Sequence, residues 1–345
     1  MTKITVSASS LRRFVSDSAS DQNTIVVKDL NAPVDRMVSV IFYTSAVMGN
    51  PQGGIDEDGA PRQNPINQTG IITSVGFKRK IRDLCNLIYG DEMHVRRRSV
   101  LVQGTLDAAV AECDDKKLVA TLTSVVDAQK AKAAEVKDKD DKGKKEKNDA
   151  RQDWAAVIAA NTKHFYDDRA FGRLFTLPIN EGVTGPIQVN HMQSLHPIDI
   201  IEIAIATVAV ASYKDKADKD SDLGRMSVVN FGLYEGVLTC TPHFARATGF
   251  TWNDLNKLLS IMPMIWDLTR STVRTGISHE RMYVFEHDSA YGSAPLNVLR
   301  KLVRPSNSET GQELPSDVAR QSMDHYNMKE LGEIILPHGV NLVVG

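Results

Sequence analysis

The chain has 345 residues, of which 42% are hydrophobic and 24% are charged, a composition typical of a soluble globular protein. This length suggests about two domains and is enough to bury a sizeable core without disulfides. The formal net charge of −2 excludes a globally basic surface, so any contact with nucleic acid must come from a local patch.

Cysteine usage and hydropathy favour the cytoplasm. Cys85, Cys113 and Cys240 are far apart and odd in number, which fits neither a disulfide framework nor a paired metal site. The first residues lack the apolar core of a signal peptide, and no apolar run approaches the roughly 20 residues that span a bilayer. We expect no membrane contact, no metal and no cofactor.

The first part of the chain predicts an arm, a strand and a long loop. Residues 1–35 are rich in Ser and Asp and predict an N-terminal arm. Residues 37–45 are rich in β-branched and aromatic side chains, as buried strands are. A loop dense in Gly, Pro and Asn follows over residues 49–70, and loops this long in a compact domain are usually functional or disordered.

A helix is predicted over residues 74–89. Its apolar residues recur at spacings of four, three and four, which places them on one face; they are Phe77, Ile81, Leu84 and Ile88. Thr73 or Ser74 would cap its start.

Residues 90–165 predict an insertion. A helical pattern over residues 118–134 runs into a charged stretch, and residues 132–151 hold eight basic and six acidic side chains. Such a nearly neutral, low-complexity segment is typical of a solvated, mobile insertion or a helix end.

The remaining elements complete an α+β pattern. Strands are predicted over 185–191, 200–212, 227–239, 281–287 and 340–344, with Ile201, Ile203 and Ile205 on one side of the second. A capping box from Thr251 to Asp254 opens a long helix that Pro263 should kink or split. Without insertions, the order approximates the βαββαβ arrangement of ferredoxin-like folds, which RNA-recognition modules share.

A basic run follows the first predicted loop. Lys78, Arg79, Lys80 and Arg82 are followed by three arginines at 96–98, and residues 78–98 carry a local charge of +4, from seven basic and three acidic side chains. Such a cluster suits phosphates. The alternative is an ordinary solvated helix face.

The 49–70 loop adds to this pattern. Its glycines permit a ligand backbone to approach closely, and the start of the following helix would offer amide groups that favour anions. Together they predict a cradle for a phosphate backbone, although the loop has no Walker or dinucleotide-binding spacing. Asn, Gly and Pro alone would indicate only a turn.

Several segments resemble, in order, the backbone subunit of type I CRISPR surveillance complexes (Cascade), and more narrowly its Csd/Csh-type members. The N-terminal segments are Gly49-Asn-Pro-Gln-Gly53, Pro61-Arg62, Gly70 and Phe77-Lys-Arg-Lys-Ile-Arg82. The later ones are Asp168-Arg-Ala-Phe-Gly172, Gly185-Pro-Ile-Gln188 with Pro197-Ile198, Phe231-Gly-Leu-Tyr234, Tyr283-Val-Phe-Glu-His-Asp-Ser289 and Gly292-Ser-Ala-Pro295. The similarity spans about residues 36–305.

The resemblance implies an RRM-like palm over residues 36–305, with a helical finger inserted at 90–165, a β-hairpin thumb at 212–227 and a C-terminal extension at 306–345. It also implies a non-catalytic protein that coats guide RNA in many copies, together with other Cascade subunits. Base pairing of the guide would then select foreign target DNA in antiviral defence, while the protein binds the RNA backbone and recognises its shape.

Carried over by position, the resemblance places Lys78, Arg79 and Arg82 on RNA phosphates. It places Asn50, Gly53 and Arg62 in an RNA-facing loop. Arg169 is a second phosphate candidate, or else the partner of Asp167 or Asp168 in an ion pair. Further candidates, each with an ordinary structural alternative, are Gln188 and Gln193 in a strand groove and Arg225 and Met226 on the thumb.

The sequence departs from the family pattern at Gln52, Ser74, Thr184 and His196, where Asn, Asp, Arg and Asp respectively are usual, so the subtype stays open.

Two rival functions also stay open. The carboxylates at 56–58 could serve a metal-dependent, RNA-cleaving subunit of the type III kind, although loop carboxylates are usually solvated. A capsid-like, purely protein-binding module is the other. His287-Asp288-Ser289 are adjacent, and adjacent residues do not make a hydrolase triad.

Overall fold

The computed structural model describes residues 11–18, 23–54, 59–91, 93–95, 158–159, 161–175, 181–207, 222–315 and 317–345. The chain is a mixed α/β protein that divides into two compact units. Unit 1 comprises Met1–Met37, Arg82–Gln188 and Thr239–Leu258, and unit 2 comprises Val38–Ile81, Val189–Leu238 and Leu259–Gly345. The helical pattern at 118–134, the charged stretch at 132–151 and the carboxylates at 56–58 lie outside the described residues.

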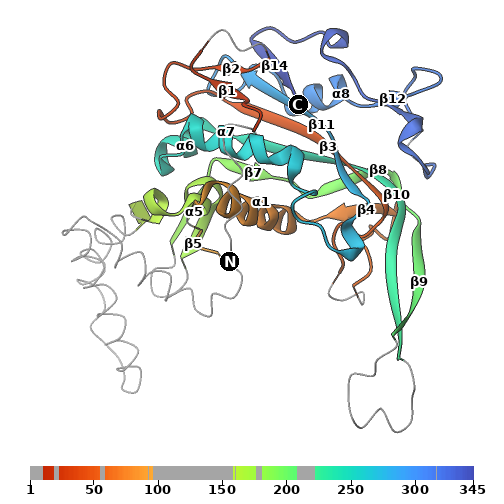
Figure 1. The fold of residues 1–345 in the computed structure, drawn as a ribbon. Helices are drawn as coiled ribbons and strands as arrows, with labels where there is room; N and C mark the ends of the chain where they lie inside the picture. The colour runs from red at the N-terminus through yellow and green to blue at the C-terminus, as the bar shows by residue number, and fades with distance from the viewer. Residues whose placement is uncertain are drawn as a thin grey trace, which may run out of the picture. The chain divides into compact units, whose positions relative to one another are not determined.

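Unit 2 is built on a long sheet (Figure 1). Its strands follow the order β14 (Val340–Val344), β11 (Ile277–His287), β3 (Val38–Gly49), β10 (Asp222–Cys240), β8 (Met192–Pro197) and β4 (Thr69–Ile72). β7 (Ile187–Val189) and β9 (Ile200–Thr207) also pair with β10. The pairs β11–β14, β11–β3, β10–β8, β10–β9 and β4–β8 are antiparallel.

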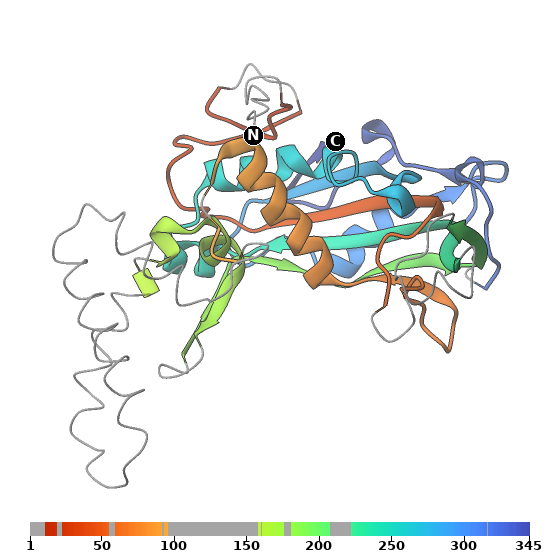
Figure 2. The ribbon, with the colours of Figure 1, turned by 60° about the horizontal axis from the view of Figure 1, so that its bottom comes forward.

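The predicted helix is confirmed as α1 (Ser74–Tyr89). Thr73 caps it, because the Gly76 amide donates to the Thr73 hydroxyl at 3.2 Å. Phe77, Ile81 and Leu84 are almost completely buried, as the spacing predicts. Phe77 stacks on Phe42 of β3 with 5.0 Å between ring centroids, so the first half of α1 packs on the sheet (Figure 2).

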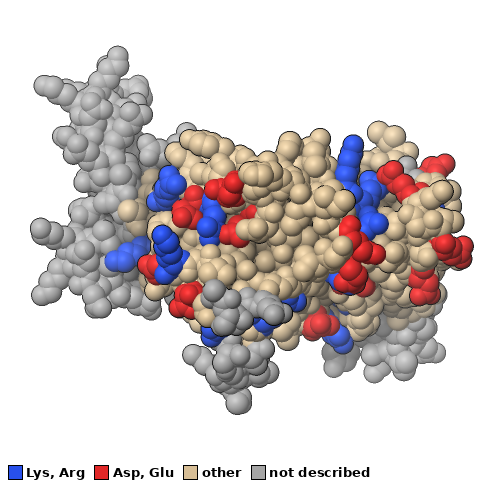
Figure 3. Space-filling view, turned by 90° about the horizontal axis from the view of Figure 1, so that it is seen from above, with Lys and Arg blue, Asp and Glu red and all other residues tan. Residues whose placement is uncertain are grey.

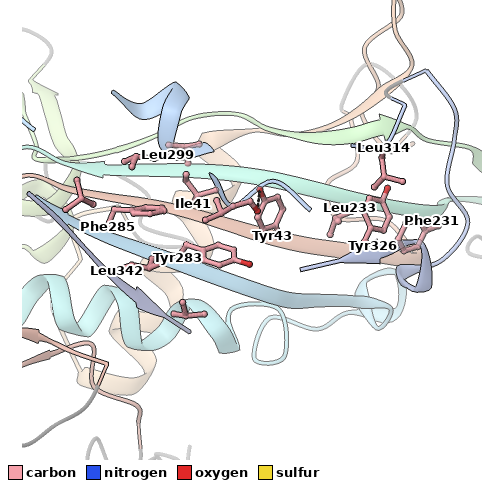
Figure 4. Packing of buried hydrophobic residues seen from close by; sticks show 14 residues of the cluster. Ile41, Tyr43, Phe231, Leu233, Tyr283, Phe285, Leu299, Leu314, Tyr326 and Leu342 are labelled. Carbon is pink, nitrogen blue, oxygen red and sulfur yellow. Dashed lines mark hydrogen bonds between the residues drawn. The ribbon is translucent and has the colours of Figure 1, made fainter. Parts of the chain in front are cut away.

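The opposite face of the sheet carries the second part of the core (Figure 4). Tyr43 of β3 and Tyr283 of β11 meet edge to face, 6.3 Å apart. α8 (Leu296–Leu302) and the short strands β12 (Ser306–Asn307) and β13 (Tyr326–Asn327) lie near this face and supply buried Leu299 and Tyr326. The segment after residue 305 therefore belongs to the core of unit 2, and β14 has the bounds that the sequence predicts.

The capping box is also confirmed. The Asp254 amide donates to the Thr251 hydroxyl at 3.1 Å, and the Thr251 amide donates to the Asp254 carboxylate at 3.0 Å. α7 (Trp252–Ile261) ends just before a 3₁₀ turn, η3 (Met262–Met264), which contains Pro263. Proline thus splits the predicted helix, because it removes a backbone donor.

The described residues at the N-terminal end of unit 1 pack against other parts of that unit. β1 (Val15–Ser16) and β2 (Ile25–Val26) pair in parallel, and Phe14 and Ile25 are fully buried. The side-chain oxygen of Asn256 accepts hydrogen bonds from the Phe14 and Val15 amides at 2.9 and 3.0 Å. Large apolar residues are few in this segment; Phe14, Val15 and Ile25 are buried, whereas Val26 is 44% exposed.

Unit 1 also contains the helix α6 (Pro242–Thr248), the short helix α5 (Tyr166–Phe171) and a hairpin of β5 (Gly172–Phe175) with β6 (Glu181–Thr184). Gly172 joins α5 to β5 with a φ of 73°. A Cβ there would lie 2.1 Å from the Val183 carbonyl oxygen, so only glycine fits this turn.

A hairpin of β9 and β10 extends from the sheet of unit 2 (Figure 1). Met226 pairs with Ile203, and Val228 pairs with Ile201, so these residues share the face that also carries Ile205. The opposite face carries Arg225 and Glu202. Residues 222–227 of the segment expected as the thumb are therefore strand, and residues 212–221 lie outside the described residues.

Candidate nucleic-acid interface

The loop after β3 is fixed by its own polar groups. Asn50 is only 6% exposed, and its amide donates to the carbonyls of Gly59 at 2.7 Å and Ser227 at 3.2 Å. Gly53 bridges to Pro61, and a Cβ at position 53 would lie 2.3 Å from the Gly59 carbonyl oxygen. Asn50 and Gly53 thus shape this loop from within.

Most backbone amides at the start of α1 already donate to side chains, which leaves fewer for an anion than the sequence predicts. The Thr73 amide donates to the Gln52 side chain at 2.7 Å, and the Ser74 amide donates to His191 Nδ1 at 3.0 Å. The Gly76 amide donates to the Thr73 hydroxyl, so three backbone amides at the start of α1 already have acceptors. Gln52 therefore has a structural role here, which the sequence did not reveal.

The basic residues on α1 differ in their burial and in their contacts. Lys80 is 9% exposed, lies 4.7 Å from the centre of the Trp266 ring and donates to Thr269 at 3.3 Å, so it belongs to the core of unit 2. Lys78 and Arg79 are half-buried on neighbouring positions of the helix.

Arg82 takes part in a buried cluster of charges in unit 1. Its Nε donates to the Asp167 carboxylate at 2.9 Å, and its guanidinium lies 4.9 Å from the Phe171 ring centre. Asp167 also accepts from the His94 amide at 2.7 Å. The guanidinium of Arg82 is therefore engaged by the protein itself.

Asp168 completes this cluster. Its carboxylate lies 2.8 Å from His94 Nδ1 and 3.7 Å from Arg173. Burial raises the pKa of the Asp168 carboxyl, an effect that the hydrogen bond from His94 opposes. These contacts join α5, β5 and the loop after α1 within unit 1.

Arg169 is held by an ion pair, but with a different partner from those expected. Its Nε and one terminal nitrogen both donate to the Asp254 carboxylate at 2.9 Å, and its side chain is 15% exposed. Another nitrogen donates to the Thr162 carbonyl at 3.0 Å. The fork of Arg169 thus ties α5 to the start of α7.

Two predicted glutamines lie on different elements. Gln188 of β7 donates to the Gly185 carbonyl at 2.8 Å, and Gln193 of β8 donates to the Thr69 hydroxyl at 2.6 Å. Both are exposed enough to meet solvent. Arg62 is half-buried, and its Nε has no hydrogen-bond partner within the part of the chain that the structure describes.

Arg225 and Met226 lie on the β9–β10 hairpin. Arg225 has an 82% exposed side chain, and its guanidinium is 3.8 Å from the Glu202 carboxylate. Met226 is half-buried opposite Ile203. The hairpin therefore presents a charged face and an apolar face.

The face drawn in Figure 3 has no large region of one charge. Figure 3 shows Lys and Arg side chains interspersed with Asp and Glu on the face in view. Among the residues with described positions, no group of His, Cys, Asp and Glu is arranged to hold a metal ion. No helix in the same part of the chain is long and apolar enough to cross a membrane.

His287 is structural as well. It is 1% exposed, its Nδ1 accepts from the Ser293 amide at 2.8 Å, and its Nε2 lies 3.2 Å from the Ser39 hydroxyl.

Comparison with known proteins gives the family. No curated protein sequence matches the chain. The solved structures that resemble it include a "CRISPR RNA-guided surveillance complex, pre-nicking" at 15% identity, with a TM-score of 0.45 over 72% of this chain and 78% of that one. They also include a "CRISPR RNA-guided surveillance complex" at 11% identity, with a TM-score of 0.38 over 72% of this chain and 68% of that one. The model of the family described as CRISPR-associated protein Cas7 matches residues 36–328. The chain therefore belongs to the Cas7 family.

Proposed function

We propose that the chain is a non-catalytic backbone subunit of a type I CRISPR surveillance complex, which binds guide RNA in multiple copies. The observation that carries this proposal is the family match over residues 36–328. Base pairing of the guide would supply sequence specificity toward target DNA, and the protein would hold the RNA backbone. A net charge of −2 is consistent with a local grip rather than a global field.

The order of the elements along the chain, and of the strands in the sheet, supports an RRM-like palm. In chain order, β3, α1, β8, β10, α7 and β11 follow the βαββαβ pattern. In the sheet, the corresponding strands lie in the order β11, β3, β10 and β8. Sheets of this kind bind single-stranded RNA in other proteins.

The β9–β10 hairpin is our candidate for the thumb. It projects from the sheet, and its apolar face includes Ile201 and Ile205, which are 38% and 40% exposed. An apolar face favours contact with bases or with a neighbouring copy, whereas Arg225 on the other face favours phosphates. Met226 belongs to the apolar face.

The RNA contacts that we propose come from Lys78, Arg79, Arg62 and Arg225. Arg82 and Arg169 are assigned to positioning instead, because Asp167 and Asp254 already engage their guanidinium groups. A phosphate that took the Nε donor of Arg82, or the Asp254-facing edge of Arg169, would have to displace a buried carboxylate, which costs on the order of 3 kcal/mol.

Sequencing the RNA that co-purifies with the chain tests this function. We expect fragments with constant, repeat-derived ends that flank varied spacers, and an absorbance ratio at 260 over 280 nm above that of protein alone. Random cellular RNA, or none, would contradict the proposal. Regular cleavage of complementary RNA that requires Mg²⁺ would instead favour the type III activity.

A further inference from the structure

Gln52 joins the loop after β3 to the first turn of α1. Its side-chain oxygen accepts from the Thr73 amide at 2.7 Å, and its side-chain nitrogen donates to the Thr73 hydroxyl at 2.8 Å. The same hydroxyl accepts from the Gly76 amide at 3.2 Å. A Cβ at position 76 would lie 2.7 Å from Nε2 of Gln52, so the glutamine amide lies directly against this turn of the helix.

The loop that carries Gln52 also carries Arg62, on the returning side of the turn. Gly53 and Pro61 form a β-bridge, which holds the outgoing and returning backbones side by side. The Arg62 carbonyl accepts from the Ile71 amide of β4 at 2.8 Å. Hydrogen bonds therefore connect the backbone at Arg62 both to the residues beside Gln52 and to the strand that precedes α1.

Three cations lie on the two segments that Gln52 connects. Lys78 and Arg79 lie in the second turn of α1. Arg62 is half-buried, and its buried Nε has no hydrogen-bond partner within the described part of the chain. A buried donor without an acceptor is unfavourable in the free protein. An anion that accepts from Arg62 would remove this cost, so the group is suited to a phosphate oxygen.

We propose that Gln52 is a positioning residue for RNA binding. It fixes Arg62 relative to Lys78 and Arg79, so that the three cations meet one sugar–phosphate backbone as a preformed set. Preformed contacts raise affinity, because fewer groups have to be ordered when the ligand binds. Gln52 acts through Thr73 and has no need to touch the RNA. This proposal rests on the proposed function for the identity of the ligand, single-stranded RNA.

The competing explanation is that Gln52 only caps α1. Loss of a cap lowers the free energy of unfolding but leaves the RNA affinity of the folded chain unchanged. Loss of a positioning residue lowers the affinity itself. The salt dependence of binding stays the same in that case, because it reports the number of phosphates contacted and not how well the contacts are arranged. Affinity and its salt slope therefore separate the two explanations.

Fluorescence anisotropy of labelled oligouridylate, titrated with the full chain at several salt concentrations, measures both quantities. The chain is first freed of nucleic acid in high salt. In Gln52→Ala we expect the dissociation constant to rise about tenfold, as when one or two further side chains have to be ordered on binding. The slope of log affinity against log salt should stay as it is in the unchanged chain.

Thr73 provides a second variant and its matched control. Thr73→Val removes the hydroxyl that Gln52 and Gly76 share, at nearly constant shape, and should also raise the dissociation constant. Thr73→Ser keeps the hydroxyl and should bind RNA as the unchanged chain does. Because Gln52 and Thr73 act through one contact, the double variant with Gln52→Ala and Thr73→Val should lose little more affinity than Gln52→Ala alone.

Circular dichroism at the temperature of the titration shows which variants are folded, and Thr73→Val decides the question if Gln52→Ala is not. An unchanged dissociation constant in the folded variants would overturn the positioning role and leave Gln52 as a cap, with the proposed function intact. A salt slope that decreases in Gln52→Ala would also overturn it, because phosphate contacts would then be lost. If the unchanged chain did not bind oligouridylate, the proposed function would fail together with this proposal.

Discussion

The Arg82 guanidinium and the Asp167 carboxylate form an ion pair, with 2.9 Å between Nε and Oδ2, in which the aspartate side chain is completely buried. The same carboxylate accepts the backbone amides of His94 at 2.7 Å and Val95 at 3.2 Å. One buried acid therefore fixes both the last half of α1 and the loop that follows it in unit 1.

We predict that Asp167→Ala strongly destabilises the protein. It leaves the Arg82 charge and two amides without their acceptor, so the free energy of unfolding should fall by about 3 kcal/mol, as when one member of a buried pair is removed. Urea unfolding followed by circular dichroism would measure this. The control is Asp267→Ala, which breaks an exposed pair with Arg270 and should cost less than about 1 kcal/mol. Equal effects of the two changes would show that the Arg82 pair contributes little.

RNA retention should depend on Lys78 and Arg79. In the double variant with alanine at both positions, we expect the purified chain to hold less RNA and to form shorter assemblies while still folding. The slope of log affinity against log salt should decrease by about 0.7 for each phosphate contact removed from a single strand. Filter binding at several salt concentrations provides the measurement.

Lys301→Ala is the control for that variant, because Lys301 is an exposed cation on α8, which lies near the opposite face of the sheet from α1. An unchanged salt slope in the double variant would disprove the phosphate assignment. Arg82→Ala is unsuitable for this test, since loss of its bond to Asp167 would perturb the fold together with any RNA contact.

Local sequence patterns predicted the helices and strands whose buried positions are apolar. The α1 face, the capping box at Thr251 and the last strand follow from spacing alone. β8 was missed because its buried positions include Ser194 and His196, which are 4% exposed, so its inward face does not look hydrophobic. Its alternation is clear only when the burial is known.

Long-range pairing limited the prediction of the site. The charge run at 78–82 was visible, but the sequence could not show that Arg82 meets Asp167, which is 85 residues away, or that Arg169 meets Asp254, also 85 residues away. A count of basic residues cannot separate cations used for folding from those available to RNA.

The hairpin of β9 and β10 should matter for assembly more than for folding. Changing both Ile201 and Ile205 to Ser should alter the free energy of unfolding by less than about 1 kcal/mol, because both are already substantially exposed. If the apolar face contacts bases or another copy, assemblies on RNA should become shorter in size-exclusion chromatography with light scattering. The control is Glu202→Gln, on the opposite face of the hairpin, which should leave the length of the assemblies unchanged. Assemblies of normal length in the isoleucine variant would show that the apolar face has no such role.

His196 should make the fold sensitive to acid. Burial lowers the pKa of His196 to about 4, below the unfolded value of about 6.5. As pH falls below about 6.5, the unfolded chain takes up a proton that the folded state excludes, so stability declines until the folded group titrates near pH 4. At pH 5 the loss of stability should be about 1–2 kcal/mol relative to pH 7.5.

Urea unfolding at pH 5 and pH 7.5 measures this difference in stability. His196→Gln, whose side chain cannot titrate, should reduce it. His325→Gln, a change at an exposed histidine, should leave the difference as it is. If the His196 variant kept the full pH dependence, the acid sensitivity would have to come from other groups, among which His279 also has a pKa lowered by burial to about 4.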